Sequence, residues 1–591
     1  MGEFVGIDPG GATKLIRTME EAKKTLAALR PELENAIATA GPDWTGRNGT
    51  AAMHRAWAFL DDSQRDLRWR ISVITRLDRS QVHVDGGLLT ARFPYAGEAE
   101  AVQAGRRAGL ALAAAFDEYK RDFSLEGWRK VEAAMAAVKD GAADPAYAAA
   151  LLAALGPGAF RTLFTQWMNV HHSGPARGLP PEPLDRARPF LGPLATAFAA
   201  AESDGRLDGR WRAEVLQKAG PATLATLAVL AKQSAAFLND AALRLLSLPG
   251  AGANMTTPHA DWNTHWLIKA YDNDPQAFQR LLADRPEAVR LVLNPLLVKG
   301  TETPGFERLL ASAFDKALRK ETGDPAVRAR AWFNLINGFG RPETDEYHPL
   351  YLSLTDSPLN VVFARHVTPY LEELARGQAR QASPELAAAL AATPPWHALD
   401  PGVPPQFFGA VMQDPKAARI LYQEFQTYVG GLDLGRYHPF SSDAAERARY
   451  TRLSAQAGGL ANLLLGGAAY AEFNDDEFAE MVANVAILPV DYTFNRVSYP
   501  GPLAATMSGY QADKLKTDLK ELVQDFLDGK TPDTARVVAD RLVDMQVDQV
   551  ITSLRKHGGE PLTPEDVDQL RQALKGRMHE ALVKALENRG G

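Results

Sequence analysis

Residues 41–49 read GPDWTGRNG, and this stretch separates two segments whose apolar residues recur with a helical period. Gly41 and Pro42 end the first segment, because glycine is favoured just beyond a helix C-terminus and proline cannot continue a helix. Asp43 and Asn48 can cap the N-terminus of the helix that follows. The stretch therefore predicts a tight turn between two helices.

Nearly heptad seams of apolar residues flank this turn. Before it, over 13–39, the seam consists of Leu15, Met19, Ala22, Leu26, Leu29, Leu33 and Ile37. After it, the seam consists of Met53, Trp57, Leu60, Gln64, Leu67, Ile71 and Ile74. Each helix has one apolar stripe, and the other helix is the nearest place to bury it. Residues 13–77 therefore predict an antiparallel helical hairpin with Trp44 at its closed end.

A short β-hairpin is expected where the helical period breaks. Residues 80–94 alternate polar and apolar side chains on both sides of an Asp-Gly-Gly turn, which is typical of two strands joined tightly. Helical periodicity then resumes over 97–121 and again over 125–139.

The dipeptide Asp-Pro stands four times before an apolar segment. Aspartate caps the free N–H groups at a helix start, and proline in the first helical position has the right φ and loses no hydrogen bond there. The four aspartates are Asp144, Asp274, Asp324 and Asp414. Their spacing is irregular, so the sequence predicts a recurrent helix start and no repeat of fixed length.

Length and Gly/Pro-rich breaks divide the 591 residues into four predicted modules. They are 1–140 with the helical hairpin, the β-hairpin and two further helices, 141–250, 251–440 with Asp-Pro helix starts, and 441–591 at the C-terminal end. Alanine, the strongest helix former, is abundant. The predicted fold class is therefore mainly α, with helical-bundle modules following the N-terminal hairpin.

Composition argues against several classes of function. The net charge of −7 gives no electrostatic reason to expect binding to nucleic acid or to an anionic membrane. The absence of cysteine excludes disulfides, thiolate metal sites and cysteine nucleophiles. The first residues lack the basic and apolar regions of a secretory signal. We therefore expect a protein that is cytoplasmic, or secreted without a cleavable signal peptide.

No apolar run reaches the roughly 18 residues that a membrane-spanning helix needs. The nearest is AQAGGLANLLLGGAAYA at 455–471, whose paired glycines favour close packing against another helix. A buried helix is the simpler interpretation, and a pore-forming or membrane-acting toxin is an alternative.

Catalytic motifs are mostly incomplete. Gln524 stands where a P-loop needs its first glycine, and Val583 stands where a zincin needs its second histidine. In one polar cluster His259, Asp261 and His265 are possible ligands for a divalent metal. A metal-dependent hydrolase is therefore another alternative. The simpler interpretation is that this segment caps a helix and that its histidines are ordinary polar groups.

Arginines gather around Trp69 within residues 65–79. Arginine beside an aromatic ring can bind nucleic acid, but Asp66 and Asp78 lie among the arginines. The pattern favours a solvated helix face or a strip of ion pairs facing a partner.

Two seam helices joined by Trp44, Thr45 and Gly46 resemble the Trp-x-Gly (ESAT-like) family, whose members are substrates and partners of type VII secretion. The resemblance covers residues 13–77 and implies a helical bundle built from two hairpins of like or unlike chains, in a bacterial setting. The family's Tyr-x-x-x-Asp/Glu motif is absent, since Phe123 follows Tyr119 at that distance. The rest of the chain looks like large uncharacterised Ala-rich helical proteins of high-GC bacteria.

These patterns favour a non-enzymatic helical interaction or structural protein, linked to type VII secretion or toxin delivery. We expect no catalytic residue, no metal and no cofactor. The expected partner is a protein, either a small Trp-x-Gly protein or a second copy, and neither nucleic acid nor a stable membrane span is expected. The residues predicted to form the turn and bind the partner are Trp44, Gly46, Met53, Trp57 and Leu60.

Overall fold

The computed structural model describes most of the chain. The described residues are 4–40, 47–76, 82–85, 87–172, 182–247, 260–293, 305–339, 357–382, 403–432, 443–471, 475–495, 509–530, 534–556 and parts of 563–587. The chain forms two compact units, Met1–Asn273 and Asp274–Gly591. Each unit is described by itself.

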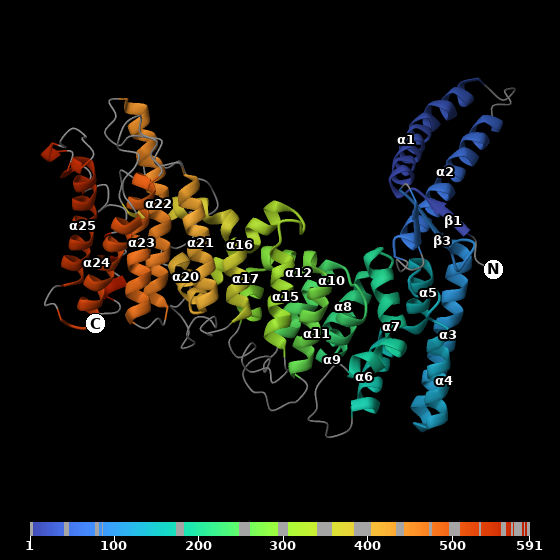
Figure 1. The fold of residues 1–591 in the computed structure, drawn as a ribbon. Coiled ribbons are helices and arrows are strands. Elements are labelled where there is room, and N and C mark those ends of the chain that lie inside the picture. Colours follow the sequence, from blue (N-terminus) through green and yellow to red (C-terminus); the bar gives the residue numbers. More distant parts are fainter. Residues whose placement is uncertain are drawn as a thin grey trace. The chain divides into compact units, whose positions relative to one another are not determined.

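The first unit begins with the helical hairpin that the two seams predict (Figure 1). Helix α1 spans Pro9–Ala40 and helix α2 spans Arg47–Ile74, and the two pack against each other. A three-stranded antiparallel sheet of order β1-β3-β2 follows at its base, with β1 at Phe4–Ile7, β2 at Val82–Asp85 and β3 at Leu88–Arg92. The predicted β-hairpin is thus confirmed, and β1 is an addition that the sequence analysis missed.

The remaining helices of this unit stack in two rows. One row runs through α3, α5, α7, α9 and α11, each packed on the next, while α8 lies between α6 and α10 in the other. Their bounds are α3 Glu98–Asp122, α4 Leu125–Ala136, α5 Pro145–Leu155, α6 Pro157–His172, α7 Glu182–Ser203, α8 Gly209–Lys218, α9 Pro221–Leu230, α10 Ala235–Leu246 and α11 Ala260–Asn273. Stacked helices bury a continuous apolar core between neighbours without needing a sequence repeat of fixed length.

The second unit has the same kind of order. Helix α12 packs on α16, α16 on α20 and α20 on α22, and beside them α15 packs on α17, α17 on α21 and α21 on α23. The bounds are α12 Pro275–Asp284, α13 Pro286–Val292, α15 Phe306–Leu318, α16 Pro325–Phe339, α17 Pro358–His366, η1 Thr368–Tyr370, α18 Leu371–Ala382, α20 Val403–Met412, α21 Pro415–Gly431, α22 Ala444–Tyr470, α23 Asp475–Asn495, α24 Gly509–Leu527 and α25 Ala535–Lys556. The observed fold is therefore mainly α with a small sheet near the N-terminus, as the sequence predicts.

All four Asp-Pro phrases start helices. Asp144, Asp274, Asp324 and Asp414 each accept hydrogen bonds from backbone N–H groups in the first turn, and each following proline is the first helical residue. The local signal was readable because both residues act within one turn of the backbone.

Buried amides join neighbouring helices of the second unit. Gln279 on α12 donates to the carbonyls of Ala317 and Thr322 at the end of α15, at 2.8 and 2.9 Å. Asn334 on α16 donates to carbonyls at the end of α12, at 2.8 and 2.9 Å. These bonds satisfy helix-end carbonyls that lack partners within their own helix.

The segment 455–471 lies in α22, and its described side chains are mostly buried. Gly466 and Gly467 face α20 so closely that an added Cβ would come within about 3 Å of Pro405 and Gly409. This is the close helix packing that the paired glycines predict. Among the described residues no single helix is both long and apolar enough to cross a membrane.

Candidate partner-docking site

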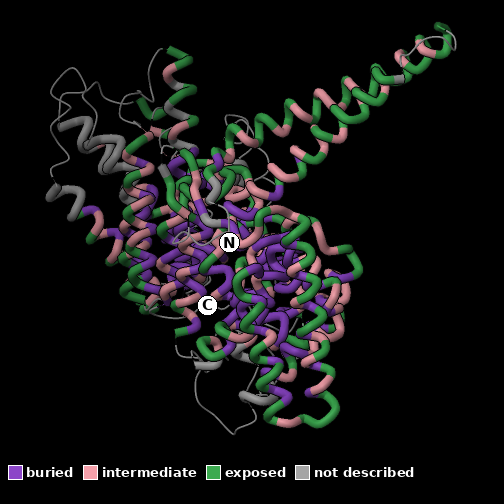
Figure 2. Tube along the Cα trace, turned by 90° about the vertical axis from the view of Figure 1, so that its right-hand side faces the viewer, coloured by how far each residue is buried: buried purple, intermediate pink, exposed green. Residues whose placement is uncertain are grey.

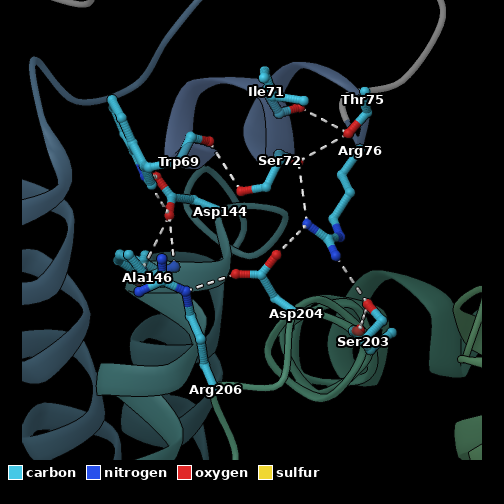
Figure 3. A network of polar contacts seen from close by, with 12 residues as sticks. Trp69, Ile71, Ser72, Thr75, Arg76, Asp144, Ala146, Ser203, Asp204 and Arg206 are labelled. Atoms are coloured by element: carbon cyan, nitrogen blue, oxygen red, sulfur yellow. Dashed lines mark hydrogen bonds and ion pairs between the residues drawn. The ribbon is translucent and has the colours of Figure 1, made fainter. Parts of the chain in front are cut away.

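The base of the hairpin is anchored to the helical stack through a buried tryptophan. Trp69, fully buried on α2, donates its Nε1–H to both carboxylate oxygens of Asp144 at 3.1 Å (Figure 3). The same carboxylate caps α5 through Ala146 and Tyr147. Burial raises the pKa of Asp144, and the three N–H donors oppose that rise by stabilising the ionised form. The Asp144 side chain therefore both caps the N-terminus of α5 and holds α2 of the hairpin against that helix.

A second contact anchors the C-terminal end of α2. The guanidinium of Arg76 donates to Asp204 at 3.2 Å and to the hydroxyl of Ser203 at 3.1 Å, both at the end of α7 (Figure 3). Asp204 also accepts from Arg206 at 2.7 Å, and Arg206 donates to Glu98 at 2.6 Å. These partly buried ion pairs tie the hairpin to two helices of the stack and fix its direction.

Beyond this base the hairpin is exposed to solvent. No residue of α1 is buried, and Figure 2 shows both helices in the colours of exposed and intermediate residues along most of their length. A helix usually gains most of its stability by burying one face. Beyond its base the hairpin therefore has its own two helices as its main packing partners, with α1 and α2 in contact along the seam.

The polar residue in the second seam clamps the two helices in register. Gln64 is 3% exposed, and it donates to the carbonyl of Ile16 and accepts from Lys23, both at 3.3 Å. Lys23 also pairs with Asp61 and lies over the Trp57 ring, 4.7 Å from its centroid. A single polar residue within an apolar seam fixes register in this way.

Above that clamp a groove opens between α1 and α2. Its volume is about 610 Å³. Its lining mixes apolar side chains with a few polar ones and consists of Leu26, Ala27, Arg30, Glu34, Thr50, Ala51, Met53, His54 and Trp57. Trp57 is 38% exposed at this groove. A half-exposed tryptophan beside a groove of mixed polarity is a residue type that often contributes strongly to binding at protein interfaces.

The predicted site residues are only partly placed by the structure. Met53 and Trp57 line the groove together, whereas Leu60 is half-buried and lies outside its lining. Trp44 and Gly46 fall outside the described residues. The structure therefore brings two of the five predicted residues to one groove.

Charged residues are sparse in the first half of α2, whereas residues 24–40 of α1 contain Lys24, Arg30, Glu32 and Glu34. Residues 48–60 contain Arg55 as their one Asp, Glu, Lys or Arg, whereas residues 61–70 contain six. An exposed helix stretch normally carries many charges. The exposed first half of α2 departs from this pattern.

Sequence reasoning missed Phe59, which is 69% exposed. It lies on α2 but outside the seam, and a seam search does not examine such positions. The available signal was a large aromatic residue on the otherwise solvated side of an amphipathic helix.

The arginines near Trp69 are engaged in ion pairs. Arg65, Arg68 and Arg70 bind Asp61, Glu20 and Asp66 respectively, at 2.5, 3.5 and 2.7 Å. Trp69 itself is buried, so its ring cannot stack on a base. These ion pairs lie within the chain and fit a solvated helix face, while pairing with a partner stays a prediction.

The alternative metal cluster of His259, Asp261 and His265 stays untested, because only one of its three side chains is described; among the described residues no group of three or more His, Asp or Glu is placed to hold a metal. His265 is half-buried in α11, and burial and the nearby Lys269 lower its pKa. Asp261 starts the same helix but its side chain is not described, and His259 lies outside the described residues.

Comparison of the chain with protein-family models, with curated proteins and with solved structures finds no match.

Proposed function

We propose that this protein is a non-enzymatic interaction protein whose N-terminal hairpin receives a partner hairpin in the groove between α1 and α2. The observation that carries the proposal is the groove itself, with Trp57 half-exposed at its edge on a hairpin whose first helix buries no residue. A partner hairpin laid on this face would complete a four-helix bundle, in which all four apolar stripes share one core.

Burial of Trp57 would supply part of the binding energy. Covering the exposed 38% of Trp57 removes roughly 80 Å² from water, if the ring offers about 200 Å², and stabilises the complex by on the order of 2 kcal/mol. The neighbouring groove residues add to this, and the anchored base keeps the hairpin from losing orientational freedom on binding. Such preorganisation lowers the entropic cost of association.

The partner that we propose is a small Trp-x-Gly protein, in the context of type VII secretion or toxin delivery. Support comes from the resemblance of residues 13–77 to that family and from the hairpin geometry of α1 and α2. In this proposal the hairpin links the helical stack of the first unit to the partner.

The test uses two neighbouring alanines of α1 that are both exposed. Ala27 lines the groove and Ala28 does not. Calorimetric titration of the full chain with a purified small Trp-x-Gly protein of the same organism should give a Kd that rises at least about tenfold in Ala27→Glu and in Trp57→Ala. Ala28→Glu should bind like the wild type. Equal binding by all four proteins, or no binding by the wild type, would rule out the groove as the docking site.

A further inference from the structure

The groove occupies one side of α2, and the opposite side carries a second exposed surface. We propose that this surface, formed by Ala52, Arg55, Ala56, Phe59 and Asp62 and here called the back face, pairs with the back face of a second copy of the chain. The two α2 helices would run antiparallel across a two-fold axis next to Phe59. This inference requires neither the groove nor a Trp-x-Gly partner, so it stands apart from the proposed function.

Helical geometry places these five residues together. Ala52, Arg55, Ala56, Phe59 and Asp62 follow the three- and four-residue steps that keep side chains on one face. Trp57 precedes Phe59 by two residues, a rotation of about 200° at 100° per residue, so its groove lies on the other side of the helix. All five back-face residues are exposed.

The back face continues a surface that is already used for packing. Fourteen residues beyond Phe59 and about 40° from it around the helix, Val73 is buried at the base of the hairpin; Trp69, about 80° from Phe59, is buried at the edge of the same face. The upper part of that face offers Phe59 at 69% exposure and two small alanines. Small residues let another helix approach closely, and the phenyl ring then supplies the area that is buried.

Charges around Phe59 are arranged in a self-complementary way. Among the α2 arginines with described side chains, Arg65, Arg68 and Arg70 have carboxylate partners and Arg55 has none. Asp62 is highly exposed, and its one carboxylate contact is at 3.7 Å, to Arg65, which already binds Asp61 at 2.5 Å.

This arrangement of charges is compatible with a two-fold axis between two copies of α2. The midpoint between residues 55 and 62 falls next to Phe59, so antiparallel pairing about that point sets Arg55 of each copy opposite Asp62 of the other. An isologous interface requires this kind of self-complementarity. Two ion pairs would flank two phenyl rings at the centre.

The packing at the hairpin base limits the geometry of the pair. Trp69 is buried about 15 Å along the helix from Phe59, at 1.5 Å per residue. A second helix therefore has to cross α2 at an angle and cannot run along its whole length. The common crossing class near −50° meets this condition. Such a short contact is smaller than a standard interface, so the dimer should be weak and concentration-dependent.

Sedimentation of the full chain over a range of concentrations, at low ionic strength, tests the pairing. The wild type should show a monomer–dimer equilibrium. Phe59→Ala should weaken it at least about tenfold, whereas Phe123→Ala, at a phenylalanine that is 64% exposed outside the hairpin, should not.

Charge reversal provides the sharper part of the test. Arg55→Glu and Asp62→Arg should each weaken the dimer, and the double variant should restore it, because the pairs then form with opposite polarity. Trp57→Ala should leave the equilibrium unchanged, which separates this result from a failure of the groove proposal. A wild type that stays monomeric, a dimer that survives Phe59→Ala, or a double variant no better than the single variants would overturn the proposal.

Discussion

Breaking the bond between Trp69 and Asp144 should release the hairpin from the helical stack. Asp144→Ala removes a helix cap, which costs about 1–2 kcal/mol, and a hydrogen bond between Trp69 and a buried carboxylate, which contributes about 1.5–3 kcal/mol. The expected total is about 2.5–5 kcal/mol. Trp69→Phe removes the same hydrogen bond and leaves a small void. The two substitutions share one interaction, so their effects should not add.

A double-mutant cycle of these two substitutions measures the free energy of the shared hydrogen bond between Trp69 and Asp144. The double variant should be less destabilised than the sum of the single variants by about 1.5–3 kcal/mol. Because the chain has two compact units, one global unfolding free energy is not well defined. Hydrogen exchange of α2 and α5 amides, followed by mass spectrometry, reports the local opening free energy instead.

The refuting result is equally specific. A coupling energy below about 0.5 kcal/mol, which is the usual error of additivity for independent sites, would show that the bond does not fix the hairpin. Asp414→Ala provides a matched control, since this buried aspartate caps α21 in the same way but has no bond to Trp69. It should leave the exchange of α2 amides unchanged.

Three further predictions concern packing, register and pH. Gly105→Ala should lower the local opening free energy of α3 by about 1–3 kcal/mol, because the added Cβ would lie 2.1 Å from the carbonyl oxygen of Tyr147. Gly192→Ala, whose added Cβ would meet Arg188 at 3.8 Å without a clash, should raise the local opening free energy of α7 by about 0.5–1 kcal/mol. Hydrogen exchange of α3 and α7 amides measures both changes. Gln64→Leu should increase the helicity of α1 and α2, measured by circular dichroism. It should also broaden the NMR signals of these helices, because the hydrogen bonds of Gln64 that fix their register are lost. Sharp, wild-type-like signals would show that Gln64 does not fix the register. Burial raises the pKa of Asp315, but hydrogen bonds from His366 and Arg319 outweigh it and hold that pKa below its ordinary value. The lowered pKa of Asp315 therefore stabilises the folded state at pH values above about 3.9, the pKa of an aspartate in an unfolded chain. This stabilisation is lost as the pH falls through the pKa of Asp315 in the folded state. Asp315→Asn should therefore reduce the acid sensitivity of the second unit, and an identical pH profile would refute this assignment.

The sequence predicted those features whose causes are local. The hairpin follows from two apolar stripes, each of which finds the other helix as the nearest place to be buried. The Asp-Pro helix starts follow from capping within one turn. Strand β1 was missed because four residues that include Gly6 carry little strand signal of their own. Its pairing with β3, such as Gly6 opposite Thr90, is a long-range contact.

The Trp69–Asp144 contact and the order of the stacked helices could not be predicted from the sequence. Asp144 was readable as a helix cap, but its bond to Trp69 joins residues 75 positions apart, and no local pattern encodes that pairing. The order of helices within the two rows is likewise a matter of non-local packing, since the irregular spacing of the Asp-Pro phrases supplies no period. Within the candidate site, Met53 and Trp57 followed from the seam, whereas Phe59 required its exposure to be seen.

The central claim, that the groove side of the hairpin is a docking surface, is tested most directly by a hydrogen-exchange footprint. The full chain would be measured with and without a saturating small Trp-x-Gly protein of the same organism. The account predicts protection concentrated in residues 24–40 and 47–60, together with loss of that protection in Ala27→Glu. Exchange in these two segments that is unchanged by the added protein, or protection that survives in Ala27→Glu, would contradict it.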